Sequence, residues 1–319
     1  MDELKFYRDM LRIRMVEEAI ALRYPEQQMR CPVHLSIGQE AVAVGACAAL
    51  EPQDYIMSGH RSHAHYLAKN GSLKAMLAEL YGRATGCCRG KGGSMHLVDL
   101  SAGFLGAVPI VGSTIPIAVG TALTAQMLGE NRVTIAFLGE GATEEGVFHE
   151  SANFASLRNL PVVFVCENNL YSVYTPLAPR QPAHREVFEQ ARGHGIESHQ
   201  ADGNDVKEVW RLTRSAVEKA RNGKGPTFLE FKTYRWREHC GPNYDNHIGY
   251  RAEEECEAWK STCPLLRLER TLLATGRLDK NKSAAMQEQI HAEILAAFQF
   301  ALESPYPSPS EANEHVYAE

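Results

Sequence analysis

The sequence predicts an α/β fold of the doubly wound type, a parallel sheet with helices on both faces, followed by C-terminal helices. Two observations indicate this class. From about residue 110, apolar runs rich in β-branched residues alternate with helical segments. The runs VTIAFL (133–138) and PVVFVC (161–166) are apolar throughout, which is typical of strands buried on both faces of a parallel sheet. The helical segments between such runs then serve as right-handed crossovers.

The elements of this sheet follow in order along the chain. Residues 115–128 form the first expected helix and residues 143–158 the second, and each lies next to one of the two apolar runs. Further along, residues 204–222 are predicted as another helix and TFLEFKTYR (227–235) as another strand. A glycine precedes each of these two segments and marks a turn. The alternation therefore continues as one α/β unit.

Segments on the N-terminal side of this alternation are mostly helical as well. Residues 1–20 carry Leu, Ile and Met at helical spacing between charged residues, and residues 38–50 and 72–82 also have helical patterns. Two stretches rich in glycine and histidine, 59–71 and 82–96, are expected to be loops.

The chain is predicted to form one domain over residues 1–319. Its core is expected at about 34–240, with a helical extension at 241–319 that ends in the turn-rich segment 304–313. No internal repeat or low-complexity linker divides the sequence.

Composition excludes several classes of partner. A net charge of −6 gives no positive field for nucleic acid or for an anionic membrane surface. No run approaches the roughly 18 apolar residues of a membrane helix, and the N-terminus lacks the apolar core of a signal peptide. We therefore expect a cytoplasmic protein without nucleic-acid or membrane partners. The 8 cysteines are scattered, which favours reduced thiols.

The most informative motif is Gly139-Glu140-Gly141, which ends one predicted strand, together with Asn168-Asn169 at the end of the next. Ligands of open parallel sheets bind beyond the carboxyl ends of the strands, so both motifs are expected at one edge. The glycines allow backbone amides to approach a phosphate, and the following helix, expected to begin near residues 142–143, adds its dipole. A carboxylate beside a phosphate requires a cation, and Mg²⁺ accepts carboxylate and amide oxygens. We predict Glu140 and Asn169 as its side-chain ligands.

Other motifs have structural interpretations that we favour. His60, His63 and His65 lack the cysteine or carboxylate that would complete a zinc site, so packing in a loop near a phosphate is expected. GCCRGKGGS (86–94) does not have the residue order of a P-loop. Cys87-Cys88 shows no motif of a catalytic cysteine.

The chain resembles the alpha subunits of the thiamine diphosphate-dependent first component of 2-oxo acid dehydrogenases, of the pyruvate, acetoin and branched-chain types. Residues 139–171 resemble the coenzyme signature of that family. Further similar segments follow in the family's order over nearly the whole chain: HLSIGQEAVAVG (34–45), HRSHAH (60–65), GKGGSMH (90–96), IPIAVG (115–120), KTYRWREH (232–239) and YRAEEECEAW (250–259).

The resemblance implies a thiamine diphosphate-binding fold with a Mg²⁺ site, and a role for each matching residue. Glu140 and Asn169 would bind Mg²⁺ through their side chains and Tyr171 through its carbonyl. The implied coenzyme-binding residues are Arg61, Val111, Gly139, Gly141, Ala142, Asn169, Arg235 and His239. His239, which ordinarily titrates near neutrality, is the first catalytic candidate, and His34 and His60 are the others.

The resemblance also implies a beta subunit, because in this family the carboxylate that activates the coenzyme belongs to a separate chain. We expect an α₂β₂ assembly that decarboxylates a 2-oxo acid and passes the acyl group to a lipoyl-bearing acyltransferase. Cys240 stands where many relatives have a phosphorylated serine, and Arg237-Glu238 departs from the usual sequence before His239. Two alternatives therefore stay open: a two-chain, transketolase-like ketol or acyl transferase, and a non-catalytic assembly subunit.

Overall fold

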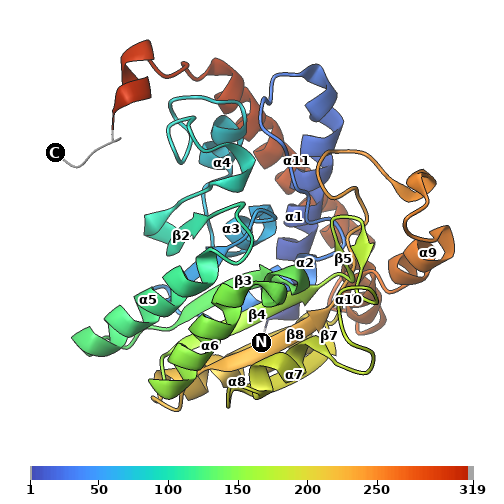
Figure 1. The fold of residues 1–319 in the computed structure, drawn as a ribbon. Coiled ribbons are helices and arrows are strands. Elements are labelled where there is room, and N and C mark those ends of the chain that lie inside the picture. The colour runs from blue at the N-terminus through green and yellow to red at the C-terminus, as the bar shows by residue number, and fades with distance from the viewer. Residues whose placement is uncertain (1, 315–319) are drawn as a thin grey trace.

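The predicted doubly wound fold is confirmed by the computed structural model, which describes residues 2–314 (Figure 1). Within these residues, six parallel strands form one sheet in the order β2-β1-β3-β4-β8-β7. The strands are β1 Tyr55–Ser58, β2 Phe104–Ala107, β3 Thr134–Gly139, β4 Val162–Asn168, β7 Glu197–Asp202 and β8 Thr227–Lys232. Strands β1, β3 and β4 are adjacent in the middle of the sheet, so their carboxyl ends meet at one edge.

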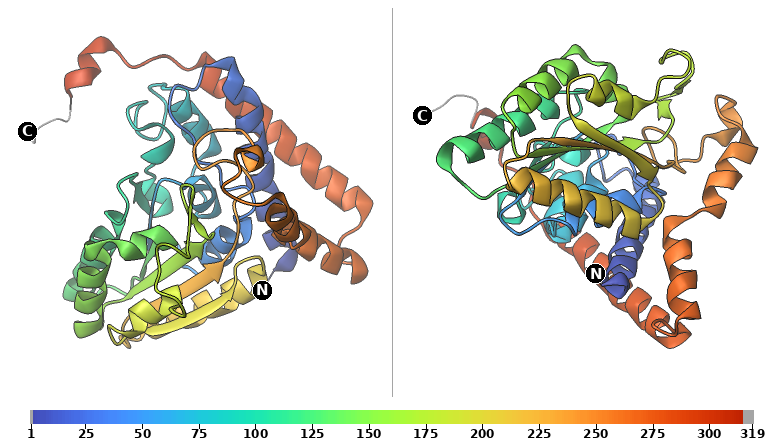
Figure 2. Two further views of the ribbon diagram at one scale, coloured as in Figure 1. Left: turned by 45° about the vertical axis from the view of Figure 1, so that its right-hand side comes forward. Right: turned by 90° about the horizontal axis from the view of Figure 1, so that it is seen from below.

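Helices cover both faces of the sheet, because alternate strand residues point to opposite sides. On β3, Ile135 and Phe137 belong to one buried cluster, while Ala136 and Leu138 belong to another. Figure 2 shows α5 and α6 on one face and α8 on the other. The covering helices are α2 Glu40–Cys47, α3 His63–Ala68, α5 Thr114–Leu128, α6 Gly146–Leu157, α7 Val187–Arg192 and α8 Val206–Arg221.

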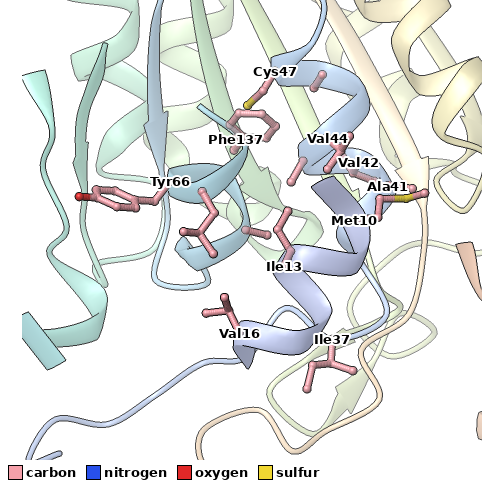
Figure 3. Close-up of a cluster of buried hydrophobic side chains, with 14 of the residues drawn as sticks. Met10, Ile13, Val16, Ile37, Ala41, Val42, Val44, Cys47, Tyr66 and Phe137 are labelled. Carbon is pink, nitrogen blue, oxygen red and sulfur yellow. The ribbon is translucent and has the colours of Figure 1, made fainter. Parts of the chain in front are cut away.

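The larger cluster joins the sheet to the N-terminal helix α1 (Glu3–Arg23). Asp2 caps this helix by accepting hydrogen bonds from the backbone N–H groups of Leu4 and Lys5. Met10, Ile13 and Val16 extend from α1 into the core, beside residues of α2 (Figure 3). The N-terminal helix thus fixes the position of α2, the first turn of which lies next to the sheet edge described below.

The C-terminal helices lie to one side of the sheet, and the last two pack against α1 (Figure 2). They are α9 Glu253–Ser261, α10 Pro264–Ala274 and α11 Lys280–Glu303. Asp279 caps α11, which packs against α1 and against α4 (Leu73–Leu80). Among the described residues, no helix is both long and apolar enough to cross a membrane, and all 8 cysteines have free thiols.

Three expectations about the elements were wrong or incomplete. The segment 59–71 is not wholly a loop, because α3 begins within it and its buried face packs into the core. Residues 140–144 form a 3-10 turn, η4 (Glu140–Glu144), and α6 begins only at Gly146. Strands β1, β2 and β7 were not identified from sequence, since β1 and β2 are only four residues long and β7, ESHQAD, is a polar edge strand.

Candidate active site

A pocket of about 860 Å³, measured with its open mouth, lies at the carboxyl ends of β1, β3 and β4. This is the edge at which ligands of open parallel sheets bind. Ten of the predicted site residues line it: His60, Arg61, Val111, Gly139, Glu140, Gly141, Ala142, Asn169, Tyr171 and His239. Two predicted residues, His34 and Arg235, are not among its lining residues.

Glu140 begins the turn η4 directly after β3, and its carboxylate is almost completely buried, with 2% exposure. Burial raises its pKa, and the neighbouring guanidinium of Arg180 opposes that rise. Arg180 Nη2 donates to Glu140 Oε1 at 2.7 Å. This pair could not be predicted from sequence, because Arg180 lies in the irregular segment after β4. A buried carboxylate at the wall of a pocket is suited to bind a cation.

Asn169 and Tyr171 follow β4 and face the same pocket. The side chain of Asn169 donates to Gln39 Oε1 at 3.3 Å and accepts from the backbone N–H of Tyr171, also at 3.3 Å. Its amide oxygen is therefore turned toward the turn that carries Tyr171. Gln39, within the segment 34–45, also lines the pocket, although it was not predicted as a site residue. The preceding Asn168 points away and donates to Glu230 at 2.6 Å.

The two arginines predicted to neutralise the diphosphate have different surroundings. Arg61 lines the pocket and donates to the backbone carbonyls of Leu35 at 2.8 Å and His239 at 3.2 Å. Burial lowers the pKa of Arg61 to about 10, so it stays charged at neutral pH. Arg235 is fully buried behind the pocket, where Nη2 donates to the carbonyl of Val173 at 2.6 Å and to the hydroxyl of Tyr250 at 2.7 Å.

The three catalytic candidates, far apart in the sequence, form one cluster. The ring centroids of His34 and His60 lie 4.6 Å apart, those of His34 and His239 lie 5.1 Å apart, and those of His60 and His239 lie 5.2 Å apart. His34 is buried behind the other two, and its Nδ1 has no hydrogen-bond partner within residues 2–314. The cluster is thus continuous with the pocket through His60 and His239.

The histidines are neutral at physiological pH, contrary to the expectation that His239 titrates near neutrality. Burial, with the charge of Arg61, lowers the pKa of His239 to about 3 and that of His60 to about 4. The same two causes lower the pKa of His34 to about 2. One ring nitrogen of each lies within 4.8 Å of those of the other two, a spacing near that of metal ligands. However, the burial and the charge of Arg61 that disfavour a proton on these rings also disfavour a metal cation. The cluster is therefore better suited to an anionic or polar ligand.

His63 and His65 have packing contacts, as expected, but they lie on helix α3 and not in a loop. His63 bonds Ser94 Oγ at 2.7 Å and lies 3.2 Å from the carboxylate of Glu17. His65 stacks on Phe137 at 3.9 Å between ring centroids. The sequence predicted neither set of partners.

A second buried carboxylate at the pocket wall was not predicted. Glu167 Oε2, near the end of β4, lies 3.3 Å from Nε2 of His65, and Nδ1 of His65 is 2.8 Å from Ser58 Oγ. All three residues line the pocket. The only signal in the sequence was the position of Glu167, directly before Asn168-Asn169. Together with Glu140, it makes the base of the pocket rich in hydrogen-bond acceptors.

Comparison with known proteins gives one family over almost the whole chain. Residues 8–310 match the model of a family described as dehydrogenase E1 component. The chain is 39% identical over 319 residues to the alpha subunit of acetoin:2,6-dichlorophenolindophenol oxidoreductase from Bacillus subtilis (strain 168), with 98% of this chain and 93% of that protein covered. It is 36% identical over 323 residues to the pyruvate dehydrogenase E1 component subunit alpha of Porphyra purpurea, covering 99% of this chain and 93% of that protein.

Proposed function

Because the chain belongs to the dehydrogenase E1 component family, we propose that it is the alpha subunit of a heteromeric 2-oxo acid dehydrogenase of the pyruvate or acetoin type. The observation that carries this proposal is the convergence of Glu140, Asn169 and Arg61 on one pocket at the carboxyl edge of the sheet. The family depends on thiamine diphosphate. The proposed reaction decarboxylates a 2-oxo acid and transfers the acyl group to a lipoyl acceptor.

The residues of the pocket fit a Mg²⁺-bound diphosphate. Glu140 would supply an anionic oxygen, Asn169 its amide oxygen and Tyr171 its backbone carbonyl, a set of hard oxygen ligands suited to Mg²⁺. Gly139 leaves open space, since a Cβ there would meet no atom of the described residues within 4 Å, whereas a Cβ on Gly141 would lie 2.9 Å from Ser172 Oγ. That space permits backbone amides to approach the phosphates closely.

Charge and shape in the rest of the pocket support the same assignment. Arg61 would neutralise part of the diphosphate charge from the β1 side, and Ala142 would line it on η4. Val111 is half exposed at the mouth, where its backbone would hold the aminopyrimidine. Arg235 would act from behind the pocket wall, by holding the carbonyl of Val173, which is a lining residue.

The catalytic proposal concerns the histidine cluster. Thiamine diphosphate supplies a nucleophilic carbon and an electron sink for decarboxylation. His239 and His60, neutral and at the pocket wall, would donate hydrogen bonds to the oxo and carboxylate oxygens of the substrate. His34 would position them from behind, since its ring contacts both. A diphosphate placed near Arg61 would also offset the positive field and raise the pKa of His239.

A beta subunit is the proposed partner, in an α₂β₂ assembly. Both named relatives are alpha subunits. In the proposal, the partner covers the mouth of the pocket and supplies the carboxylate that activates the coenzyme. The chain alone is therefore expected to be inactive.

The test is CO₂ release by the chain copurified with its native partner, in the presence of Mg²⁺, thiamine diphosphate and an artificial electron acceptor. A panel of 2-oxo acids would identify the substrate, and the chain without its partner serves as the control. Bound coenzyme without CO₂ release from any acid would contradict the dehydrogenase proposal.

A further inference from the structure

The buried carboxylate of Glu140 already has a cation beside it, one that belongs to the chain itself. Arg180 Nη2 lies 2.7 Å from Glu140 Oε1, and the side chains of both residues are largely buried, with 10% and 2% exposure. A carboxylate buried away from water is destabilised unless a positive charge or several hydrogen-bond donors satisfy it. Arg180 supplies both the charge and the donor.

Arg180 is held in this position by a set of contacts from its other nitrogens. Nη1 pairs with Glu144, and Nε donates to the carbonyls of Thr175 and Pro176, each at 3.2 Å. The neighbouring Gln181 donates to the same Glu144 oxygen at 3.1 Å. The segment 175–181 is therefore held against the turn η4 by the ion pairs of Arg180 with Glu140 and Glu144.

The guanidinium also lies over the glycine turn of the pocket. A Cβ built on Gly141 would be 3.7 Å from Arg180 Nη1 and 2.9 Å from Ser172 Oγ. This is the space that the proposed diphosphate would enter. The side chain of Arg180 thus blocks part of both the metal position and the phosphate position.

We propose that Arg180 is the internal cation that satisfies Glu140 in the coenzyme-free chain, and that Mg²⁺-thiamine diphosphate replaces it on loading. This inference rests on the proposed function. Mg²⁺ binds carboxylate oxygens at about 2.1 Å, so a guanidinium on the same oxygen would be a repelling charge in direct contact with the site. Loading therefore requires Arg180 to leave Glu140 and frees the segment 175–181 from that anchor.

The exchange has a measurable consequence for affinity. When a site is open in only a fraction of the molecules, the apparent dissociation constant equals the intrinsic constant divided by that fraction. If the pair is formed in about nine of ten coenzyme-free molecules, removal of Arg180 tightens binding by about tenfold. A residue that instead bound the diphosphate would have the opposite effect, so the direction of the change distinguishes the two roles.

The experiment compares wild type and Arg180→Gln as complexes with the native partner, stripped of metal and coenzyme. Mn²⁺ is the probe, titrated by electron paramagnetic resonance at a fixed concentration of thiamine diphosphate. We expect Arg180→Gln to bind Mn²⁺ about tenfold more tightly than wild type. Arg185→Gln is the matched control, because Arg185 lies nearby and its side chain bonds Gln181 rather than Glu140.

A second readout uses thermal unfolding without metal or coenzyme. Arg180→Gln should lower the melting temperature in the wild-type background and have much less effect in Glu140→Gln, since the charge to be satisfied is then absent. An equal loss of melting temperature in both backgrounds would overturn the inference. Unchanged or weaker Mn²⁺ binding by Arg180→Gln would also overturn it. Neither result would contradict the proposed function. Absence of Mn²⁺ binding by wild type would overturn both.

Discussion

Arg61 donates a hydrogen bond to the backbone carbonyl of His239, although 178 residues separate them in the chain. The other terminal nitrogen of Arg61 donates to Leu35, so one guanidinium connects three distant segments. The backbone N–H of Gly241, just after His239, in turn donates to the carbonyl of Val33 at 2.8 Å. These contacts hold the catalytic candidates against the wall of the pocket.

Replacing Arg61 with lysine should weaken the attachment of the His239 loop to the pocket wall. A lysine has one ammonium group and cannot bond both carbonyls in the geometry of a guanidinium. We expect binding of Mg²⁺-thiamine diphosphate to weaken by about 10-fold to 100-fold. Calorimetry measures the affinity, and hydrogen exchange should increase at residues 236–241. Arg214→Lys, in an exposed ion pair with Glu218 on α8, is the control.

Glu140→Gln keeps the shape of the side chain and removes its charge. Mg²⁺-dependent binding of thiamine diphosphate should then fall by more than about 100-fold, because the anionic ligand is lost. Isothermal calorimetry at saturating Mg²⁺ measures the change. Glu218→Gln, which removes an exposed carboxylate paired with Arg214 on α8, should bind normally. Unchanged affinity in Glu140→Gln would rule out the metal assignment.

His239→Ala should separate catalysis from binding. The substitution removes the 3.4 Å contact between Arg61 and Nδ1 of His239, but the hydrogen bond from Arg61 to the backbone carbonyl survives, so the loop keeps that anchor. We expect kcat to fall by about 10²-fold or more, with little change in coenzyme affinity. Steady-state kinetics and calorimetry on the same preparation measure the two quantities. His199→Ala serves as the control, because that imidazole is exposed and bonds Glu197. Equal losses of kcat and affinity would indicate a structural role.

The histidine cluster should make the chain sensitive to acid. His34 has a pKa of about 2 in the folded chain and 6.5 as its ordinary value, so below 6.5 the unfolded chain binds a proton that the folded chain does not. Its contribution to stability is complete above pH 6.5 and is lost as the pH falls toward the folded value. The slope for one such group is at most about 1.4 kcal/mol per pH unit.

Urea unfolding of His34→Gln tests this pH dependence. The free energy of unfolding should decline less steeply between about pH 6.5 and about pH 5 than in wild type, because one proton-linked group is gone. The exposed residue His199, replaced in the same way, should leave the slope nearly unchanged. An identical slope in His34→Gln would contradict the burial of a neutral imidazole at this position.

Gly38 should be intolerant of any side chain. Its φ is +102°, and a Cβ there would lie 2.4 Å from the carbonyl oxygen of Tyr234 and 2.6 Å from the ring of Trp236. Gly38→Ala should therefore destabilise the protein by more than about 3 kcal/mol in denaturant unfolding. Gly223 is the matched control, since its φ is +70° and a Cβ would meet no atom of the described part of the chain within 4 Å. Gly223→Ala should lose only about 1 kcal/mol.

The sequence by itself determined the central strands β3 and β4 of the sheet and the meeting of its two motifs. Apolar runs and crossover helices predict adjacent parallel strands, and adjacent parallel strands bring their carboxyl ends to one edge, so Glu140 and Asn169 had to lie near each other. These are local patterns combined with one general rule of topology. The resemblance of short segments then identified the family, which the match over residues 8–310 confirms.

Only the tertiary structure decided which charges and rings face one another. The approach of His34 to His60 and His239, the turn of Arg235 away from the pocket, and the pairing of Arg180 with Glu140 depend on side-chain directions in irregular segments. No periodicity encodes such directions, because they follow from packing between residues far apart in the chain. The neutral state of the histidines is decided in the same way, since burial and the charge of Arg61 exist only after folding.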